Sequence, residues 1–211
     1  MVIARQSIVS NEVENKAVEI VKLLMKRPIT EEIAMQVDTY DGFKLLEITD
    51  GEWVGFDEDE YMGGERHGWR ESILIAFLTI WALENQTGRI YSGDTSFVLD
   101  GDMDNIKVRR KPDVGFVQTN RLQTTEKYYI GAPDLAVEIT SPSDTGSEIQ
   151  AKIDEYFQYG TQQVWQVYPD NEQIIVYLPD GTSKKFGIGD KIGGGELLAG
   201  FELDVSKVFE S

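Results

Sequence analysis

The chain has 211 residues, of which 41 % are hydrophobic and 27 % are charged, and its net charge is -17. This length and this balance are typical of one globular domain with a sizeable core, and they exclude a largely disordered chain. The negative charge repels polyanions at long range, so it argues against a strong non-specific DNA binder and leaves nucleic-acid contact to a local basic patch.

The absence of cysteine excludes disulfides, thiolate metal sites and thiol catalysis, and it favours a reducing cytoplasm. Glu12 and Glu14 make the first residues too polar for a signal peptide, so we do not expect secretion. The longest apolar run, Ile73 to Leu83, is shorter than the roughly 18 residues of a membrane span. We therefore expect this run to be a buried helix and expect no membrane partner.

The first elements of the chain are predicted to be two helices and a hairpin. Apolar residues recur at three- or four-residue spacing from Glu12 to Lys26, which indicates an amphipathic helix ending at Arg27-Pro28. Thr30 is a typical cap for a second, short helix. The pair Asp50-Gly51 favours a tight turn, and the strands expected around it are Phe43 to Ile48 and Trp53 to Phe56.

Helices and strands then alternate along the rest of the chain, which predicts an α/β fold. Thr145 and Glu148 have the spacing of a capping box, and Gly160 supplies a left-handed stop. The expected elements are a helix from about Trp69 to Gly88, strands at Ile90 to Leu99, Val108 to Val117 and Leu135 to Thr140, a helix from Gly146 to Tyr159, and strands at Gln163 to Tyr168 and Gln173 to Leu178.

Two of these strands carry a carboxylate that their apolar pattern does not need. Asp113 follows Pro112 at the start of one run, and Glu138 interrupts Leu135 to Ile139. Adjacent strands would present both carboxylates to one divalent cation. The alternative for Asp113 is a local turn hydrogen bond, since an Asp after a proline commonly forms one.

The ordered motifs of this region are Pro112-Asp113, Ala132 to Asp144, Lys152-x-x-Glu155-Tyr156-x-x-x-Gly160, and Val164-Trp165-Gln166-Val167. Together they resemble the Uma-type family of restriction endonucleases, part of the restriction-endonuclease-like PD-(D/E)XK group. The resemblance covers roughly Gly42 to Phe209. It implies a mixed β-sheet flanked by helices, a bound Mg²⁺ or Mn²⁺, and cleavage of nucleic acid. Residues 1–41 would then be an N-terminal helical extension packed on the core, and residues 42–211 the nuclease domain.

The resemblance also implies catalytic roles for Asp113, Glu138 and Lys152. In the plain group pattern a lysine stands two residues after the second acid, and here that position is Thr140. Uma-type sequences resemble a variant whose lysine has moved to the next helix, which is the position of Lys152. A surface ion pair with Glu148, four residues earlier, is the alternative for Lys152.

The chemistry of Mg²⁺ accounts for this combination of residues. The ion prefers oxygen ligands and keeps several waters, so Asp113, Glu138 and the backbone carbonyl of Ile139 would leave positions for a phosphate oxygen and an attacking water. Family members often carry a His at the start of the long helix. His67, the only histidine, and Glu71 one turn later are therefore expected as accessory residues beside the metal.

The basic run from Lys107 to Lys111 leads into the expected site and has two readings. Its cations would hold a phosphate backbone next to the metal, or they would neutralise acids such as Asp100, Asp102 and Asp104 across a hairpin. The acidic stretch Asp100 to Asn105 starts like a calcium loop but lacks its later ligands, so we expect a solvated hairpin loop. The candidate phosphate-binding residues are Lys107, Arg109, Arg110 and Lys111.

The sequence as a whole favours a metal-dependent endonuclease with DNA as the expected substrate and a homodimer as the expected assembly. The alternative is a catalytically silent nuclease fold that acts as an oligomeric binding or regulatory module. That alternative is supported by the net charge of -17, by Thr140 at the usual lysine position and by the lack of an aromatic-rich basic surface. Metal binding distinguishes the two.

Overall fold

The structure is a computed structural model, and it describes residues 19–40, 46–55, 65–124, 127–142 and 144–210. The chain forms two compact units, one of Met1–Phe56 with Asp100–Arg109 and the other of Asp57–Leu99 with Arg110–Ser211. The chain passes from one unit to the other after Phe56, after Leu99 and after Arg109. The domain boundary that we expect between residues 41 and 42 stays a prediction.

The first unit has the two local signals that were expected. Helix α2 (Glu31–Asp38) begins at Thr30, whose side-chain oxygen accepts a hydrogen bond from the N–H of Ile33. Strands β1 (Glu47–Thr49) and β2 (Glu52–Val54) pair around Asp50 and Gly51, both at positive φ, as a tight hairpin turn requires. The cap and the turn are confirmed. Residues 19–24 are helical, and the rest of the first expected helix and of the first expected strand lies partly outside the described residues.

The acidic stretch after Leu99 is the turn of a hairpin, as predicted. Strands β4 (Phe97–Asp102) and β5 (Asn105–Arg110) flank it, and Asp102 Oδ1 accepts hydrogen bonds from the backbone N–H groups of Asp104 and Asn105. Strand β5 also pairs with β1 in the first unit.

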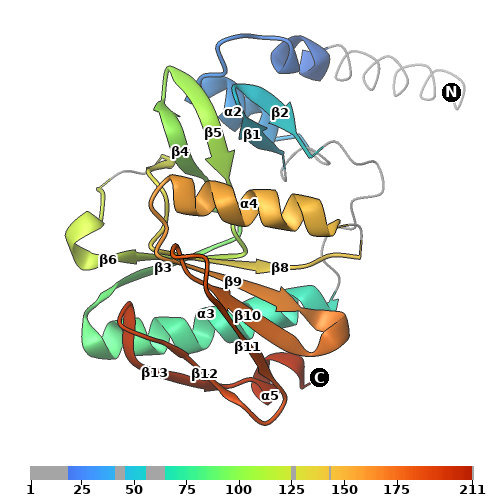
Figure 1. Ribbon diagram of the computed structural model, residues 1–211. Helices are drawn as coiled ribbons and strands as arrows, with labels where there is room; N and C mark the ends of the chain where they lie inside the picture. The colour runs from blue at the N-terminus through green and yellow to red at the C-terminus, as the bar shows by residue number, and fades with distance from the viewer. Residues whose placement is uncertain (1–18, 41–45, 56–64, 125–126, 143, 211) are drawn as a thin grey trace, which may run out of the picture. The chain divides into compact units, whose positions relative to one another are not determined.

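The second unit is built on a six-stranded mixed sheet with the order β11-β10-β9-β8-β6-β3 (Figure 1). Strands β8 and β9 are parallel, and the other neighbouring pairs are antiparallel. This arrangement confirms the predicted α/β class with a mixed sheet. The strands are β3 (Gly88–Ser92), β6 (Val114–Gln118), β8 (Leu135–Ile139), β9 (Gln163–Tyr168), β10 (Gln173–Tyr177) and β11 (Ser183–Gly187).

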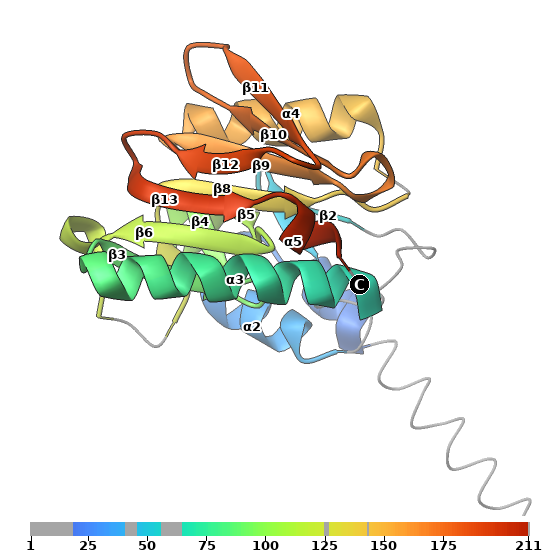
Figure 2. The ribbon, with the colours of Figure 1, turned by 90° about the horizontal axis from the view of Figure 1, so that it is seen from below.

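Helices α3 (Glu65–Asn85) and α4 (Gly146–Gln158) lie on opposite faces of this sheet (Figures 1 and 2). Successive strand residues point to opposite faces, so Val137 faces the core beneath α3, whereas Glu138 faces α4. The predicted capping box of α4 is present, with Thr145 and Glu148 bonded to each other's backbone. Gly160 follows at φ 96°, which confirms the left-handed stop.

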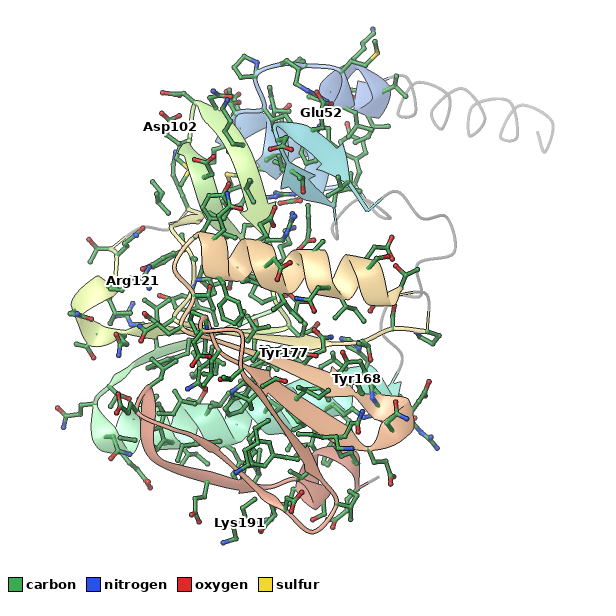
Figure 3. All side chains as sticks on the ribbon, viewed as in Figure 1. Glu52, Asp102, Arg121, Tyr168, Tyr177 and Lys191 are labelled. Carbon is green, nitrogen blue, oxygen red and sulfur yellow. The ribbon has the colours of Figure 1, made fainter. Side chains whose placement is uncertain are left out.

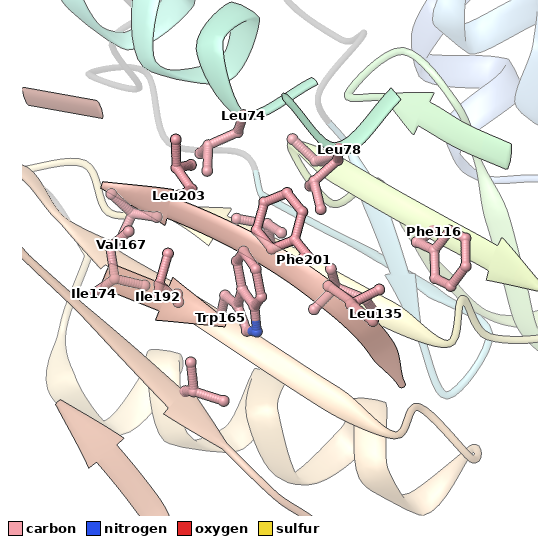
Figure 4. Close-up of a cluster of buried hydrophobic side chains, with 14 of the residues drawn as sticks. Leu74, Leu78, Phe116, Leu135, Trp165, Val167, Ile174, Ile192, Phe201 and Leu203 are labelled. Carbon is pink, nitrogen blue, oxygen red and sulfur yellow. The ribbon is translucent and has the colours of Figure 1, made fainter. Parts of the chain in front are cut away.

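The core beneath α3 is closed by the last part of the chain (Figure 4). Strands β12 (Lys191–Gly194) and β13 (Leu198–Asp204) form a separate antiparallel pair, and α5 (Ser206–Phe209) follows. Trp81 of α3 donates its indole N–H to the backbone oxygen of Ala199 and packs edge-on against Phe201. In the described ranges, no helix has both the length and the apolar composition needed to cross a membrane.

Two long strands of the prediction are each broken into two, and these breaks place the candidate site. The expected strand Ile90 to Leu99 is interrupted after Ser92, where the backbone turns through Gly93 before β4. The expected strand Val108 to Val117 is interrupted at Lys111 to Asp113, because Pro112 has no N–H for the ladder. Asp113 therefore stands immediately before β6 rather than inside a strand.

Candidate metal centre

Asp113 is held by contacts on both of its carboxylate oxygens. Oδ2 accepts a hydrogen bond of 2.6 Å from the backbone N–H of Ile139, and Oδ1 lies 3.0 Å from Nε2 of His67. The first contact comes from β8 and the second from α3. Asp113 thus joins the strand that carries Glu138 to the helix that carries the only histidine, and it is more than a local turn residue.

The first turns of α3 bring a second acid to the same place. One ligand atom from each of His67, Glu71 and Asp113 lies within 4.8 Å of the others, and all three residues are partly buried. His67 and Glu71 are four residues apart, so they lie on one face of the helix. Glu71 Oε1 also accepts a hydrogen bond of 3.3 Å from the backbone N–H of Gly93. The turn after β3 therefore borders this cluster.

The pKa values of Glu71 and His67 are both raised in this cluster. Burial is the main cause that raises the pKa of Glu71, and the negative charges of Asp113 and Asp94 raise it further. The hydrogen bond to Asp113 is the main cause that raises the pKa of His67, and the charges of Asp113 and Glu71 add to this effect against the cost of burial. Both shifts favour the protonated forms of Glu71 and His67.

Glu138 is held by two residues of α4. Its Oε1 accepts a hydrogen bond of 2.6 Å from the hydroxyl of Tyr156, and its Oε2 lies 3.4 Å from Nζ of Lys152. Lys152 and Tyr156 are four residues apart and share one helix face. Glu148 is engaged in the capping box at Thr145. The Lys152 amine therefore lies beside Glu138, and its catalytic role stays a prediction.

The pairing of β6 with β8 relates the position of Asp113 to that of Glu138. Val114 is opposite Val137 in an antiparallel register, so extending the register by one residue places Asp113 opposite Glu138. In an extended residue the N–H and the C=O lie on the same edge of the strand. Since the N–H of Ile139 reaches Asp113, its carbonyl faces this same edge of β8.

Thr140 forms hydrogen bonds that join the ends of β8 and β9. Its backbone N–H and its hydroxyl both donate to the backbone oxygen of Val167, at 2.9 and 3.1 Å. These bonds extend the parallel pairing of β8 and β9 beyond Ile139. The position that holds the lysine in the plain group pattern thus secures the end of a strand.

Two members of the basic run are buried in ion pairs. Arg109 is 0 % exposed, and its guanidinium donates to Asp38 and to the backbone oxygen of Leu46 and lies over the ring of Trp53. Arg110 pairs with Glu155 at 2.5 Å, also largely buried. The prediction that Arg109 and Arg110 bind phosphate is therefore wrong, because both side chains are buried. Both guanidinium groups pair with acids, which agrees with the second reading, and these acids are Asp38 and Glu155.

The buried Tyr156 is the site residue that sequence reasoning did not single out. The available signal was its spacing, because a residue four positions after Lys152 must share the helix face of Lys152. Its aromatic character pointed instead to the core, and Tyr156 is indeed 0 % exposed. Only the hydroxyl contact with Glu138 shows that this buried ring also belongs to the site.

Comparisons with known proteins agree with the fold and the motifs. No curated protein matches the chain. Among solved structures, one described as a "putative nuclease belonging to DUF820" from Anabaena variabilis is similar, with a TM-score of 0.70 and 18 % sequence identity over 86 % of this chain and 98 % of that one. At this identity the likeness establishes the fold. Residues 57–206 match the Uma2 family, which is described as "Putative restriction endonuclease". Since this match spans most of the chain and includes every residue of the candidate centre, the protein belongs to the Uma2 family.

Proposed function

We propose that this protein is a metal-dependent endonuclease that hydrolyses phosphodiester bonds of DNA. The observation that carries the proposal is the position of Asp113, which contacts His67 of α3 and the backbone of Ile139 beside Glu138. The ligand atoms of His67, Glu71 and Asp113 thus lie within 4.8 Å of one another, and Glu138 stands next to Ile139, whose backbone N–H Asp113 contacts. Packing of the core does not explain these polar side chains, because burying charged groups costs free energy unless they are paired.

The donor set fits a divalent cation. Carboxylate and carbonyl oxygens are the ligands that Mg²⁺ and Mn²⁺ prefer, and an imidazole nitrogen suits transition metals. Asp113, Glu138 and the Ile139 carbonyl would supply the oxygens, with His67 and Glu71 as accessory residues. The proximity of Glu71 and His67 to Asp113 supports this assignment, because one cation could reach a ligand atom of each.

A bound divalent cation would lower the pKa of a coordinated water and neutralise charge on the phosphate. Asp113 and Glu138 serve to bind the cation. Lys152, whose amine lies 3.4 Å from Glu138, supplies a positive charge that orients the attacking water or stabilises the charge developing on the phosphate. Lys107 and Lys111 remain the candidates from the basic run for contact with the phosphate backbone.

Purified full-length protein is expected to nick supercoiled plasmid DNA with Mg²⁺ or Mn²⁺ and to lose this activity in excess chelator. The physical reason is that the carboxylates hold the cation and do not themselves activate water. Calorimetric titration of the protein with Mn²⁺ alone is expected to give a dissociation constant of about a millimolar or less. If the protein binds neither ion at millimolar concentration, the proposal gives way to the catalytically silent binding module.

Tyr156 is expected to act as a positioning residue that orients Glu138. In Tyr156→Phe the ring that fills the core stays, while the 2.6 Å hydrogen bond to Glu138 Oε1 is lost. Residues that orient metal ligands typically change metal affinity or activity by about 10- to 100-fold. We therefore expect cleavage at limiting Mn²⁺ to fall about tenfold and to recover as Mn²⁺ is raised, which a cleavage assay over a Mn²⁺ titration measures.

Tyr129→Phe is the matched control for Tyr156→Phe. Tyr129 is also buried, and its hydroxyl donates at 2.8 Å to the backbone oxygen of Arg121, away from the candidate centre. The two variants lose one hydrogen bond each, so both lower stability to a similar extent. Equal dependence on Mn²⁺ in both variants and the parent would mean that Tyr156 is only structural.

A further inference from the structure

Helix α3 has a second apolar stripe, on the side opposite the core. Its core side is formed by Leu74, Leu78 and Trp81 together with Ala82. At 100° per residue, the stripe lies about 180° away from that core side. Its exposed members are Trp69, Ala76, Ile80 and Leu83, and Ile73, at the edge of the stripe, is partly buried against the core.

The large side chains of this stripe are exposed to solvent. Trp69 is 50 % exposed, Ile80 is 55 % exposed and Leu83 is 71 % exposed. The indole N–H of Trp69 donates to the backbone oxygen of Glu210, which holds the ring in place at the surface. Scattered exposed apolar residues are common, but several on one face of the same helix are typical of a contact surface.

We infer that this stripe is a homodimer interface, in which α3 of a second copy of the chain lies antiparallel against α3 of the first. The spacing of the stripe is self-complementary, as a two-fold symmetric interface requires. Trp69 and Leu83 are each seven residues from Ala76, and Ile73 and Ile80 are three and four residues from it. A two-fold axis at Ala76 would pair each large residue with a large residue of the second copy.

Ala76 is the residue that lets the two helices approach. It is exposed, and it is the smallest member of the stripe. Helices pack 8 to 10 Å apart depending on the side chains at the contact, so a small residue at the crossing point brings the flanking residues into contact. Trp69 at one end and Leu83 at the other would then close the interface on both sides.

Charges beside the stripe complement each other in the same antiparallel arrangement. Arg66 and Glu84 are both exposed, and both lie on the same flank of the stripe, at the two ends of the helix. In an antiparallel pair, residues on the same flank face each other across the interface. Arg66 of one copy would thus face Glu84 of the second copy, twice by symmetry.

The first arm of the test introduces a charge into the stripe. Sedimentation of the full chain over about 1 to 100 µM is expected to show a dimer for the parent. Ile80→Glu is expected to raise the dissociation constant by roughly a hundredfold or more, because a buried carboxylate would lack a partner. Ile188→Glu is the matched control, since Ile188 is 54 % exposed in the turn before β12, and it is expected to leave the dimer intact.

The second arm tests which residues face each other. Arg66→Glu alone and Glu84→Arg alone are each expected to weaken the dimer about tenfold, since each creates two like-charge pairs. The double variant Arg66→Glu with Glu84→Arg is expected to restore the parent dissociation constant within about threefold. Circular dichroism checks that every variant is folded, and this result is independent of nuclease activity.

A parent chain that is monomeric throughout this range would overturn the inference. So would a dimer that survives Ile80→Glu, because its interface would have to lie elsewhere. A double charge variant that is no tighter than the single ones would exclude the antiparallel arrangement and the second copy as the occupant of this stripe.

Discussion

Replacement of Asp113 by Asn, or of Glu138 by Gln, is expected to lower the rate of DNA cleavage by about a hundredfold or more while the protein stays folded. Each amide keeps the shape of the side chain and an oxygen that accepts the existing hydrogen bond, from Ile139 or from Tyr156. The negative charge that binds the cation is lost, and with it the lowered pKa of the water. Plasmid nicking at a fixed Mn²⁺ concentration, with thermal unfolding in parallel, measures both effects.

Glu196→Gln is the control for these variants because it makes the same change of charge at an exposed position. It is expected to cleave at the parent rate. Asp113→Asn and Glu138→Gln must also bind Mn²⁺ more weakly than the parent. If either variant cleaves within about threefold of the parent and binds the ion equally well, that residue is not a metal ligand.

Asp134→Ala is expected to lower the free energy of unfolding by about 3 kcal/mol or more, the largest stability effect that we expect at a charged residue. Asp134 is 0 % exposed. One carboxylate oxygen accepts from Arg121 and Gln162, both at 2.7 Å, and the other accepts from the backbone N–H of Gln118 at 2.8 Å. Figure 3 shows Arg121 at the end of β6, in the short helix η1 (Thr119–Arg121). The substitution leaves these donors without their acceptor, and urea unfolding measures the loss.

Asp134→Asn is the companion variant, since its oxygen still accepts one of these bonds, and a smaller loss is expected. Under conditions where the variants stay folded, Mn²⁺ binding is expected to equal that of the parent. An Asp134→Ala protein as stable as the parent would show that the three contacts contribute little. Weakened Mn²⁺ binding in a folded variant would instead bring Asp134 into the metal site.

The two Pro-Asp pairs show why residue type and neighbours do not suffice to assign a role. Pro112-Asp113 and Pro133-Asp134 both stand directly before an apolar strand. Asp134 is fully enclosed by donors that hold two loops together, whereas Asp113 keeps a partly exposed carboxylate beside His67 and Glu71. The difference comes from elements far away in the chain, so no local pattern contains it.

The basic run makes the same point for charges. Arg109 and Arg110 are neighbours in a sequence that alternates in the manner of a strand, and both are arginines that could hold phosphate. Their actual partners, Asp38 and Glu155, are 71 and 45 positions away. Arg109 meets Asp38 within the first unit and Arg110 meets Glu155 within the second, so two neighbouring residues find their partners in different units.

Local sequence was enough for the features whose energetics are local. The cap at Thr30, the turn at Asp50-Gly51 and the capping box at Thr145 each depend on residues within four positions, and each is present as predicted. The motifs around Asp113, Glu138 and Lys152 also identified the family. Long-range packing decided the rest: where the long strands break, which acids pair with the arginines, and that the Tyr156 hydroxyl orients toward Glu138. These outcomes depend on which strands and helices meet, and that is set by burial of the whole apolar surface rather than by any single segment.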